Sequence, residues 1–301
     1  MTNFILIAVC ILSGILVKRY KALPPDSFKS VNAWLINIAL PAVALKYLPQ
    51  MEWTEELLLP LLMPLAVWTG AYLCIRALGR ARTLDKETRA VLLLTAGLGN
   101  TSFIGFPLTQ AYFGDEGLPV AVFYDQVTFI IISTLAIFTA VKASNGGSFH
   151  PRATLRKIFS FPPFIAFILA FVLPEYFSFD PILPVLNALA ATLVPFALFS
   201  VGMQLPLKDW KTDRGLIAFA LSYKLVLAPL FLFAICLLFS LKGLTAQVSV
   251  FEASMAPMVT GAIIAIDHNL NPPLANKILG IGILTSFFTT FIWSLVLPAI
   301  G

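Results

Sequence analysis

Charged residues are scarce in this chain. They make up 12% of its 301 residues, against roughly a quarter in ordinary soluble domains. Hydrophobic residues make up 59%, and 26 residues are Phe, which is more apolar surface than a soluble core of this size can hide. The composition excludes an ordinary soluble domain and requires lipid around much of the surface.

Histidine and cysteine are also rare. The two histidines, His150 and His268, fall in or beside predicted loops, and the chain contains no HExxH or GxSxG motif. The three cysteines, Cys10, Cys74 and Cys236, lie inside apolar segments, and an odd number without paired spacing indicates neither disulfides nor a metal site. We therefore expect neither an enzyme nor a cofactor.

The net charge of +5 does not indicate a nucleic-acid partner, because the basic residues fall in short loops between apolar segments. Ten such segments are long enough to span a bilayer as helices, whereas outer-membrane strands are about 10 residues long and alternate in polarity. The sequence thus predicts an all-α membrane protein with spans near 3–17, 31–48, 57–78, 90–113, 118–141, 158–173, 183–203, 216–240, 247–266 and 277–300.

The distribution of lysine and arginine predicts the orientation. Nearly all 20 of them follow odd-numbered segments, and the exceptions are Lys46, Lys224 and Lys242. Because the side rich in basic residues is normally cytoplasmic, both termini are expected on the non-cytoplasmic side of the bacterial cytoplasmic (inner) membrane.

The loop at 142–157 divides the ten segments into five and five. Since five is odd, the second half must be inverted relative to the first, which gives repeats at 1–141 and 158–301 within a single transmembrane unit, 1–301. Pro41 and Pro195 occupy matching segments of the two halves, as do Pro107 and Pro257. For Pro41 and Pro195 an ordinary kink is the favoured interpretation.

The fourth segment differs, because Pro107 is accompanied by a run of small and polar residues at 97–105. This run predicts an unwound stretch near the middle of the membrane, which lipid tolerates only where the freed backbone groups face protein or water. Broken helices in matching segments of inverted repeats usually mark the central binding site of a transporter.

Asp125, Lys224 and Glu252 lie within the fifth, eighth and ninth segments, where each ionisable group costs roughly 2.5 to 3.5 kcal/mol. If Lys224 pairs with one carboxylate, the other needs a proton, a cation or a watery cavity. This pattern indicates a monovalent coupling ion. The alternative is a buried ion-pair network that only holds the helices together.

Two segments carry a resemblance to a known family: 99–107, which reads GNTSFIGFP, and 37–42, which reads NIALPA. Together with GMQL at 202–205 and EASMAP at 252–257, they resemble the auxin efflux carrier family of permeases, which belongs to the superfamily of bile acid, arsenite and riboflavin transporters. The resemblance covers essentially the whole chain.

The resemblance implies ten transmembrane helices in two inverted five-helix repeats, with helices 4 and 9 broken and crossing at their prolines. Helices 1, 2, 6 and 7 would form a scaffold, and helices 3, 4, 5, 8, 9 and 10 a transport domain that moves as an elevator. Scaffold helices in such folds often form homodimers. The short central loop resembles that of bacterial-type members, which are regarded as permeases for small organic acids such as malate or malonate.

The resemblance also implies site residues. The expected substrate-binding residues are Asn100, Thr101, Ser102, Pro107, Pro257 and Lys224. The expected coupling-ion ligands are Glu252, Asp125, Asn100 and Thr101, with a sodium site at Glu252, Asn100 and Asp125. A second sodium site is not expected, because Met255 is followed by Ala256 and Pro257 without an amide. Proton coupling is therefore an equal alternative.

These features predict a secondary active transporter for a small organic anion, either a mono- or a dicarboxylate, coupled to sodium or protons. A passive channel or facilitator is the alternative, because broken helices could also line a pore. No arginine lies deep in a segment, which argues against a bidentate carboxylate clamp. Substrate identity, direction and stoichiometry are left open by the sequence.

Overall fold

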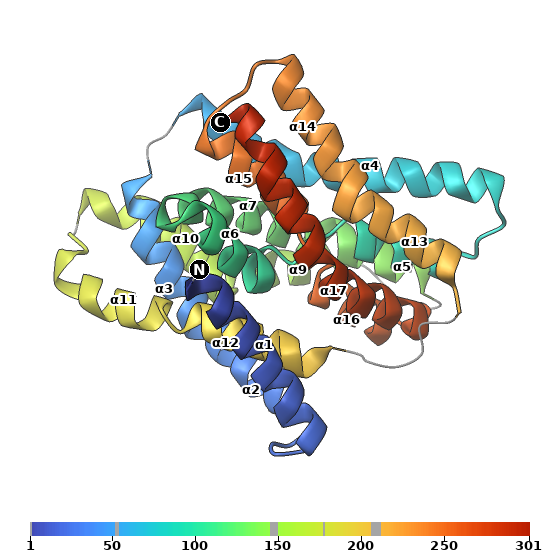
Figure 1. Cartoon of the computed structure of the whole chain (residues 1–301), viewed down its shortest axis with the longest axis horizontal. Helices are drawn as coiled ribbons and strands as arrows, with labels where there is room; N and C mark the ends of the chain where they lie inside the picture. The colour runs from blue at the N-terminus through green and yellow to red at the C-terminus, as the bar shows by residue number, and fades with distance from the viewer. Residues whose placement is uncertain (1, 52–53, 145–149, 177, 206–211) are drawn as a thin grey trace. The chain divides into compact units, whose positions relative to one another are not determined.

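The computed structural model describes residues 2–51, 54–144, 150–176, 178–205 and 212–301. All regular secondary structure of these residues is helical, and they form no β-strand, which confirms the all-α class. The α-helices in Figure 1 are α1 (Thr2–Tyr20), α2 (Ser27–Trp34), α3 (Leu40–Tyr47), α4 (Leu58–Ala81), α5 (Lys86–Ala96), α6 (Phe106–Phe113), α7 (Leu118–Ile131), α8 (Ile137–Ala143), α9 (Pro151–Phe159), α10 (Pro162–Val172), α11 (Leu183–Ala190), α12 (Leu193–Gln204), α13 (Arg214–Ser222), α14 (Ala228–Leu238), α15 (Leu244–Ala253), α16 (Val259–Asp267) and α17 (Pro272–Val296).

Short 3₁₀ and π turns extend or join these helices. The four π turns are η1 (Leu35–Ala39), η4 (Thr101–Gly105), η6 (Ile132–Ala136) and η9 (Tyr223–Leu227). The 3₁₀ turns are η2 (Leu48–Gln50), η3 (Glu55–Leu57), η5 (Asp115–Gly117), η7 (Leu173–Glu175), η8 (Asp180–Ile182) and η10 (Leu297–Ile300).

Six continuous helical segments of the described chain are long and apolar enough to cross a membrane. They are Ser27–Tyr47, Glu55–Ala81, Asp115–Ala143, Asp180–Gln204, Arg214–Leu238 and Pro272–Ile300. Of the other four predicted spans, 3–17 lies in α1, and 158–173 corresponds to the shorter apolar helix Pro162–Glu175. The spans predicted at 90–113 and 247–266 are each divided into two shorter helices. The count of ten spans therefore stays a prediction.

Three of the π turns end two residues before a proline, namely Pro41, Pro107 and Pro229. Proline lacks an N–H and its ring clashes with the carbonyl four residues earlier, so a widened turn relieves both problems without ending the helix. At Pro41 the predicted kink is such a turn. Pro195 instead lies in the first turn of α12, where a missing N–H costs nothing.

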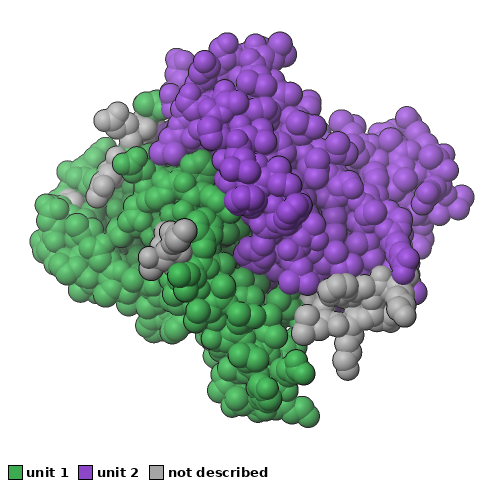
Figure 2. Space-filling model, in the orientation of Figure 1, with its two compact units in different colours: residues 1–54, 102–122, 155–205 green, residues 55–101, 123–154, 206–301 purple. Residues whose placement is uncertain are grey.

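The chain forms two compact units, each assembled from separate parts of the sequence (Figure 2). The first unit comprises residues 1–54, 102–122 and 155–205, and the second comprises 55–101, 123–154 and 206–301.

Within the first unit, α1 and α12 lie side by side (Figure 1). Gly14 and Gly202 face each other there, and a Cβ on either would collide with backbone of the opposite helix. Small residues allow membrane helices this close approach, so that van der Waals packing holds the pair. Lys18 Nζ donates a hydrogen bond of 2.7 Å to the carbonyl of Leu205, just after the end of α12. The negative end of the α12 dipole attracts the positive charge of Lys18 there.

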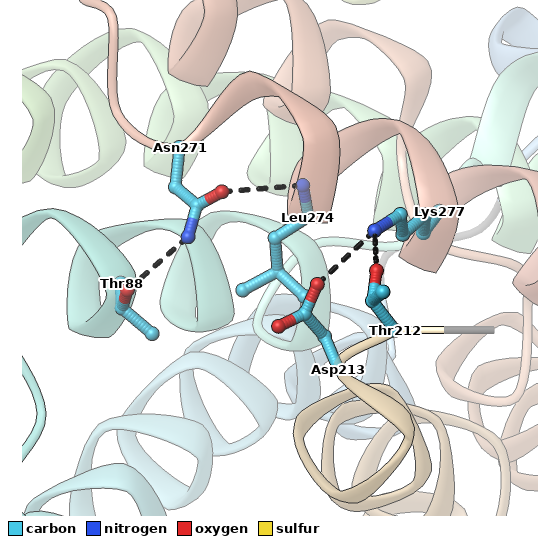
Figure 3. A network of polar contacts seen from close by, with 6 residues as sticks. All are labelled: Thr88, Thr212, Asp213, Asn271, Leu274 and Lys277. Atoms are coloured by element: carbon cyan, nitrogen blue, oxygen red, sulfur yellow. Dashed lines mark hydrogen bonds and ion pairs between the residues drawn. The ribbon is translucent and has the colours of Figure 1, made fainter. Parts of the chain in front are cut away.

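Within the second unit, a polar network joins the start of α17 to two neighbouring segments (Figure 3). Asn271, in a left-handed conformation, accepts a hydrogen bond from the Leu274 amide and donates one of 3.3 Å to Thr88 in α5. Lys277 pairs with Asp213 at 3.1 Å and also donates to Thr212. These contacts fix the N-terminus of α17 relative to α5 and to the segment before α13.

Candidate functional site

The second unit contains two helix interruptions that pair with each other. Residues 97–100 follow α5 without being helical, and residues 254–258 separate α15 from α16. Gly99 and Pro257 form an isolated antiparallel bridge between these stretches. Two nonhelical segments from distant parts of the sequence thus meet at one point.

Two backbone hydrogen bonds flank this bridge. The amide of Asn100 donates to the carbonyl of Ala256 at 2.8 Å, and the amide of Met258 donates to the carbonyl of Leu98 at 3.1 Å. Because lipid offers no hydrogen bonds, backbone groups freed by a broken helix need such partners. The bridge therefore allows both helices to be interrupted inside an apolar environment.

Lys224 lies beside the bridge and is 1% exposed. Its Nζ donates a hydrogen bond of 2.8 Å to the carbonyl of Ala253, the last residue of α15. Carbonyls at a helix C-terminus lack helical partners, and the negative end of the helix dipole favours a cation there. The charge of Lys224 is also attracted by that of Glu252, which lies in the same last turn.

The position of the Lys224 ammonium group depends on Gly99. A Cβ at residue 99 would lie 2.9 Å from Lys224 Nζ, closer than real Cβ contacts. The absence of a side chain at Gly99 therefore provides the space through which the ammonium group reaches α15.

On the other side of the interruption, Thr101 Oγ1 donates a short hydrogen bond of 2.5 Å to Asp125 Oδ1 in α7. Both residues are buried. One turn further along α7, Thr128 is buried as well, and its hydroxyl donates to the carbonyl of Tyr124. These hydroxyl, carboxylate and carbonyl groups are oxygen donors of the kind that hard cations prefer.

A cavity of about 10 Å³ lies against the interruption, lined in part by Gly99, Tyr124, Thr128 and Lys224. This volume is at the lower limit of what holds one water molecule. This cavity thus has room for a water-sized species and not for an organic acid.

Six of the eight predicted site residues lie in the second unit: Asn100, Thr101, Asp125, Lys224, Glu252 and Pro257. The structure joins Thr101 to Asp125, Asn100 to the residue before Pro257, and Lys224 to the helix that carries Glu252. Ser102, in η4, and Pro107, in α6, belong to the first unit. The partner of Pro257 in the bridge is Gly99 rather than Pro107.

Two further residues support this site although the sequence gives no sign of their role. Trp293 Nε1 donates to the carbonyl of Leu225 at 3.0 Å, within the π turn that carries Lys224. Gly282 in α17 leaves room for the ring of Pro257, since a Cβ there would lie 2.5 Å from Pro257 Cδ. Neither residue belongs to a motif, and their role depends on tertiary packing that the sequence does not reveal.

Apolar helices of spanning length, together with buried charges beside a pair of broken helices, define an integral membrane protein of the transporter class. Residues 1–294 match the family described as membrane transport protein, so the chain belongs to this family, that of the auxin efflux carrier permeases. Its members are transporters and not enzymes.

Curated relatives agree with this assignment. The chain is 27% identical to an uncharacterized transporter of Methanothermobacter thermautotrophicus, over 97% of this chain and 96% of the relative. It is 26% identical to an uncharacterized transporter of Methanocaldococcus jannaschii, over 98% and 96%. It is also 28% identical to a Rhizobium meliloti protein described as "Putative malonate transporter", over 73% of this chain and 71% of the relative.

Proposed function

We propose that this protein is a secondary active transporter that carries a small organic anion, a mono- or dicarboxylate, across the bacterial inner membrane. The transported anion binds beside the interrupted helices, and its uptake is coupled to sodium or protons. The ten predicted spans form two inverted repeats with both termini on the non-cytoplasmic side, and alternating access is of the elevator type.

The observation that carries this proposal is the paired interruption of α5 and α15 at Gly99 and Pro257, beside the buried charges of Asp125, Lys224 and Glu252. Broken helices present backbone N–H groups and helix termini that can bind an anion or a cation. The N-terminus of α16, which starts at Val259, supplies such donors on the far side of the bridge.

A dicarboxylate is supported in particular by the relative described as "Putative malonate transporter". The cavity of about 10 Å³ beside Gly99 is too small for such a substrate, so binding requires a conformation in which the site opens. This requirement favours a carrier with alternating access over an open pore.

We expect purified protein in proteoliposomes to accumulate radiolabelled malonate or malate when an inward gradient of sodium or of protons is imposed, and to catalyse counterflow. A carrier turns over slowly because each cycle includes a conformational change. Flux that only equilibrates the two sides and proceeds far faster than carrier turnover would identify a channel. Screening monocarboxylates, dicarboxylates and neutral analogues in parallel defines the substrate class.

Glu252→Gln tests the coupling ion. Glu252 is fully buried at the end of α15, where a carboxylate must be balanced by a bound cation, a proton or a neighbouring charge. We expect the variant to be less stable than wild type, because buried Lys224 then lacks a balancing charge, and its folded fraction to lose ion dependence: counterflow persists, while accumulation driven by the ion gradient disappears. Glu116→Gln, which removes an exposed carboxylate from η5, serves as control. Unchanged ion dependence in Glu252→Gln would contradict a coupling role.

A further inference from the structure

The second unit contains a cavity of about 640 Å³ between α4, α5 and α8. Four basic side chains line it: Arg76 from α4, Lys86 and Arg89 from α5, and Lys142 from α8. No acidic residue lines this cavity among the residues that the structure describes. Asp85 and Glu87 flank Lys86 in the sequence, and Asp85 accepts a hydrogen bond from Thr88 as the N-cap of α5.

The four cations converge although like charges repel. Arg89 lies against the backbone of α4, because a Cβ at Gly79 would be 3.2 Å from its guanidinium carbon. Lys142 Nζ lies 6.0 Å from the ring centre of Phe138, one turn away on α8. The positive charges in this cavity raise its electrostatic potential. A bound anion would reduce the repulsion between the basic side chains and so lower the free energy of the protein.

The remaining wall of the cavity is apolar apart from the hydroxyl of Tyr72 and that of Thr139, which donates to the carbonyl of Leu135. Trp68 in the lining is buried, while Tyr72 and Phe138 are each about half exposed and form its apolar edge. Leu135, also in the lining, is 40% exposed, and Leu73 next to Tyr72 is 57% exposed. Such side chains on spanning helices face lipid. A ligand that fits this cavity must therefore present an anionic group to the basic residues and hydrocarbon to the apolar edge.

We propose that this cavity binds an anionic phospholipid, with the headgroup phosphate held by Arg76, Arg89 and Lys142 and an acyl chain lying along the apolar edge formed by Tyr72, Leu135 and Phe138. Arginine side chains bind phosphate in a bidentate manner, and basic pockets between transmembrane helices select anionic headgroups. A small soluble anion would leave the apolar edge without a partner. This lipid site is separate from the proposed transport site at the interrupted helices.

Replacing Arg76 and Arg89 by glutamine tests the proposal. The matched control is Arg80→Gln with Arg82→Gln, which removes two exposed charges from the end of α4 and the next residue without touching the cavity. Native mass spectrometry of delipidated protein measures binding of phosphatidylglycerol against phosphatidylcholine. We expect wild type and the control pair to prefer phosphatidylglycerol, and the cavity pair to bind it roughly 30-fold more weakly, from about 1 kcal/mol per lost charge.

Two further measurements make the result decisive. The cavity variant must elute as a single species with wild-type thermal stability in lipid-free detergent, and Arg76→Lys, which keeps the charge, should retain the lipid preference. The proposal is overturned if the cavity pair keeps the wild-type preference or if both pairs lose it equally. It is also overturned if inorganic phosphate or malonate at low millimolar concentration displaces phosphatidylglycerol, since the cavity would then be a site for soluble anions.

Discussion

Lys224→Met is expected to abolish ion-driven uptake and to lower the stability of the protein strongly. The substitution removes the hydrogen bond of 2.8 Å to the Ala253 carbonyl and the positive charge that attracts Glu252. Breaking a buried charged pair by removing one partner typically costs about 3 to 5 kcal/mol. At about 2 to 4 °C per kcal/mol, the value for domains of 150 to 250 residues, this is a fall of roughly 6 to 20 °C in the unfolding midpoint, and the fall is smaller for a longer chain such as this one.

The double variant Lys224→Met with Glu252→Gln separates the loss of the hydrogen bond to the Ala253 carbonyl from the loss of the charge that balances Glu252. It removes both charges, so part of the lost stability should return, while the Ala253 carbonyl still lacks its donor at a cost of about 1 to 3 kcal/mol. A double-mutant cycle of the two single variants and the double variant therefore gives a favourable interaction energy between Lys224 and Glu252. The unfolding midpoint is measured in detergent for wild type, the two single variants and the double variant. The inactivation half-life is measured in parallel, because unfolding of such proteins is often irreversible.

Uptake is expected to stay absent in the double variant even where stability recovers, because the C-terminus of α15 is no longer held beside the bridge. The next residue of the π turn, Leu225, is apolar and cannot replace the lost cation. If Lys224→Met were as stable and as active as wild type, the ammonium group would not be what holds the end of α15.

Two features of this candidate site were predictable from the sequence, namely the burial of its ionisable residues and the unwound stretch beside them. Asp125, Lys224 and Glu252 stand out because ionisable residues are expensive inside apolar segments, and all three are buried. The glycines and polar residues of 97–105 predict an unwound stretch, and the structure interrupts the helix at 97–100. These two structural predictions are confirmed because they rest on local composition and on the cost of placing polar groups in lipid, whereas the roles of these residues in binding and coupling stay predictions.

The partners of these residues were not predictable. Which segment meets Gly99, and that Lys224 donates to the Ala253 carbonyl, follow from packing between distant parts of the chain. The same limit applies to proline: Pro107 marked the unwound stretch in the sequence, yet it lies beyond the interruption in α6. A proline signals a local backbone defect, and neighbouring helices decide whether that defect becomes a widened turn or a break.

Gly282→Ala is expected to impair transport although residue 282 is not one of the buried ionisable residues Asp125, Lys224 and Glu252. Its Cβ would lie 2.5 Å from Pro257 Cδ, 2.7 Å from Pro257 Cγ and 2.9 Å from Leu221 Cδ2. A long flexible side chain could move aside, but the ring of Pro257 is fixed to its own backbone. The added methyl group therefore displaces the Gly99–Pro257 bridge itself, and overpacking of this kind typically costs about 1 to 3 kcal/mol.

Gly215→Ala is the matched control because it adds the same methyl group to another helix of the second unit. The nearest atom to its Cβ is Arg82 Nη1 at 3.4 Å, the end of a flexible and exposed side chain. Removing a helical glycine there should leave stability unchanged or raise it by up to about 1 kcal/mol. Only Gly282→Ala should therefore lower the unfolding midpoint, and the uptake rate should fall in that variant alone. The two variants differ in that only the methyl group at residue 282 collides with the ring of Pro257. If both variants had the same uptake rate and the same unfolding midpoint, the position of Pro257 would not control transport.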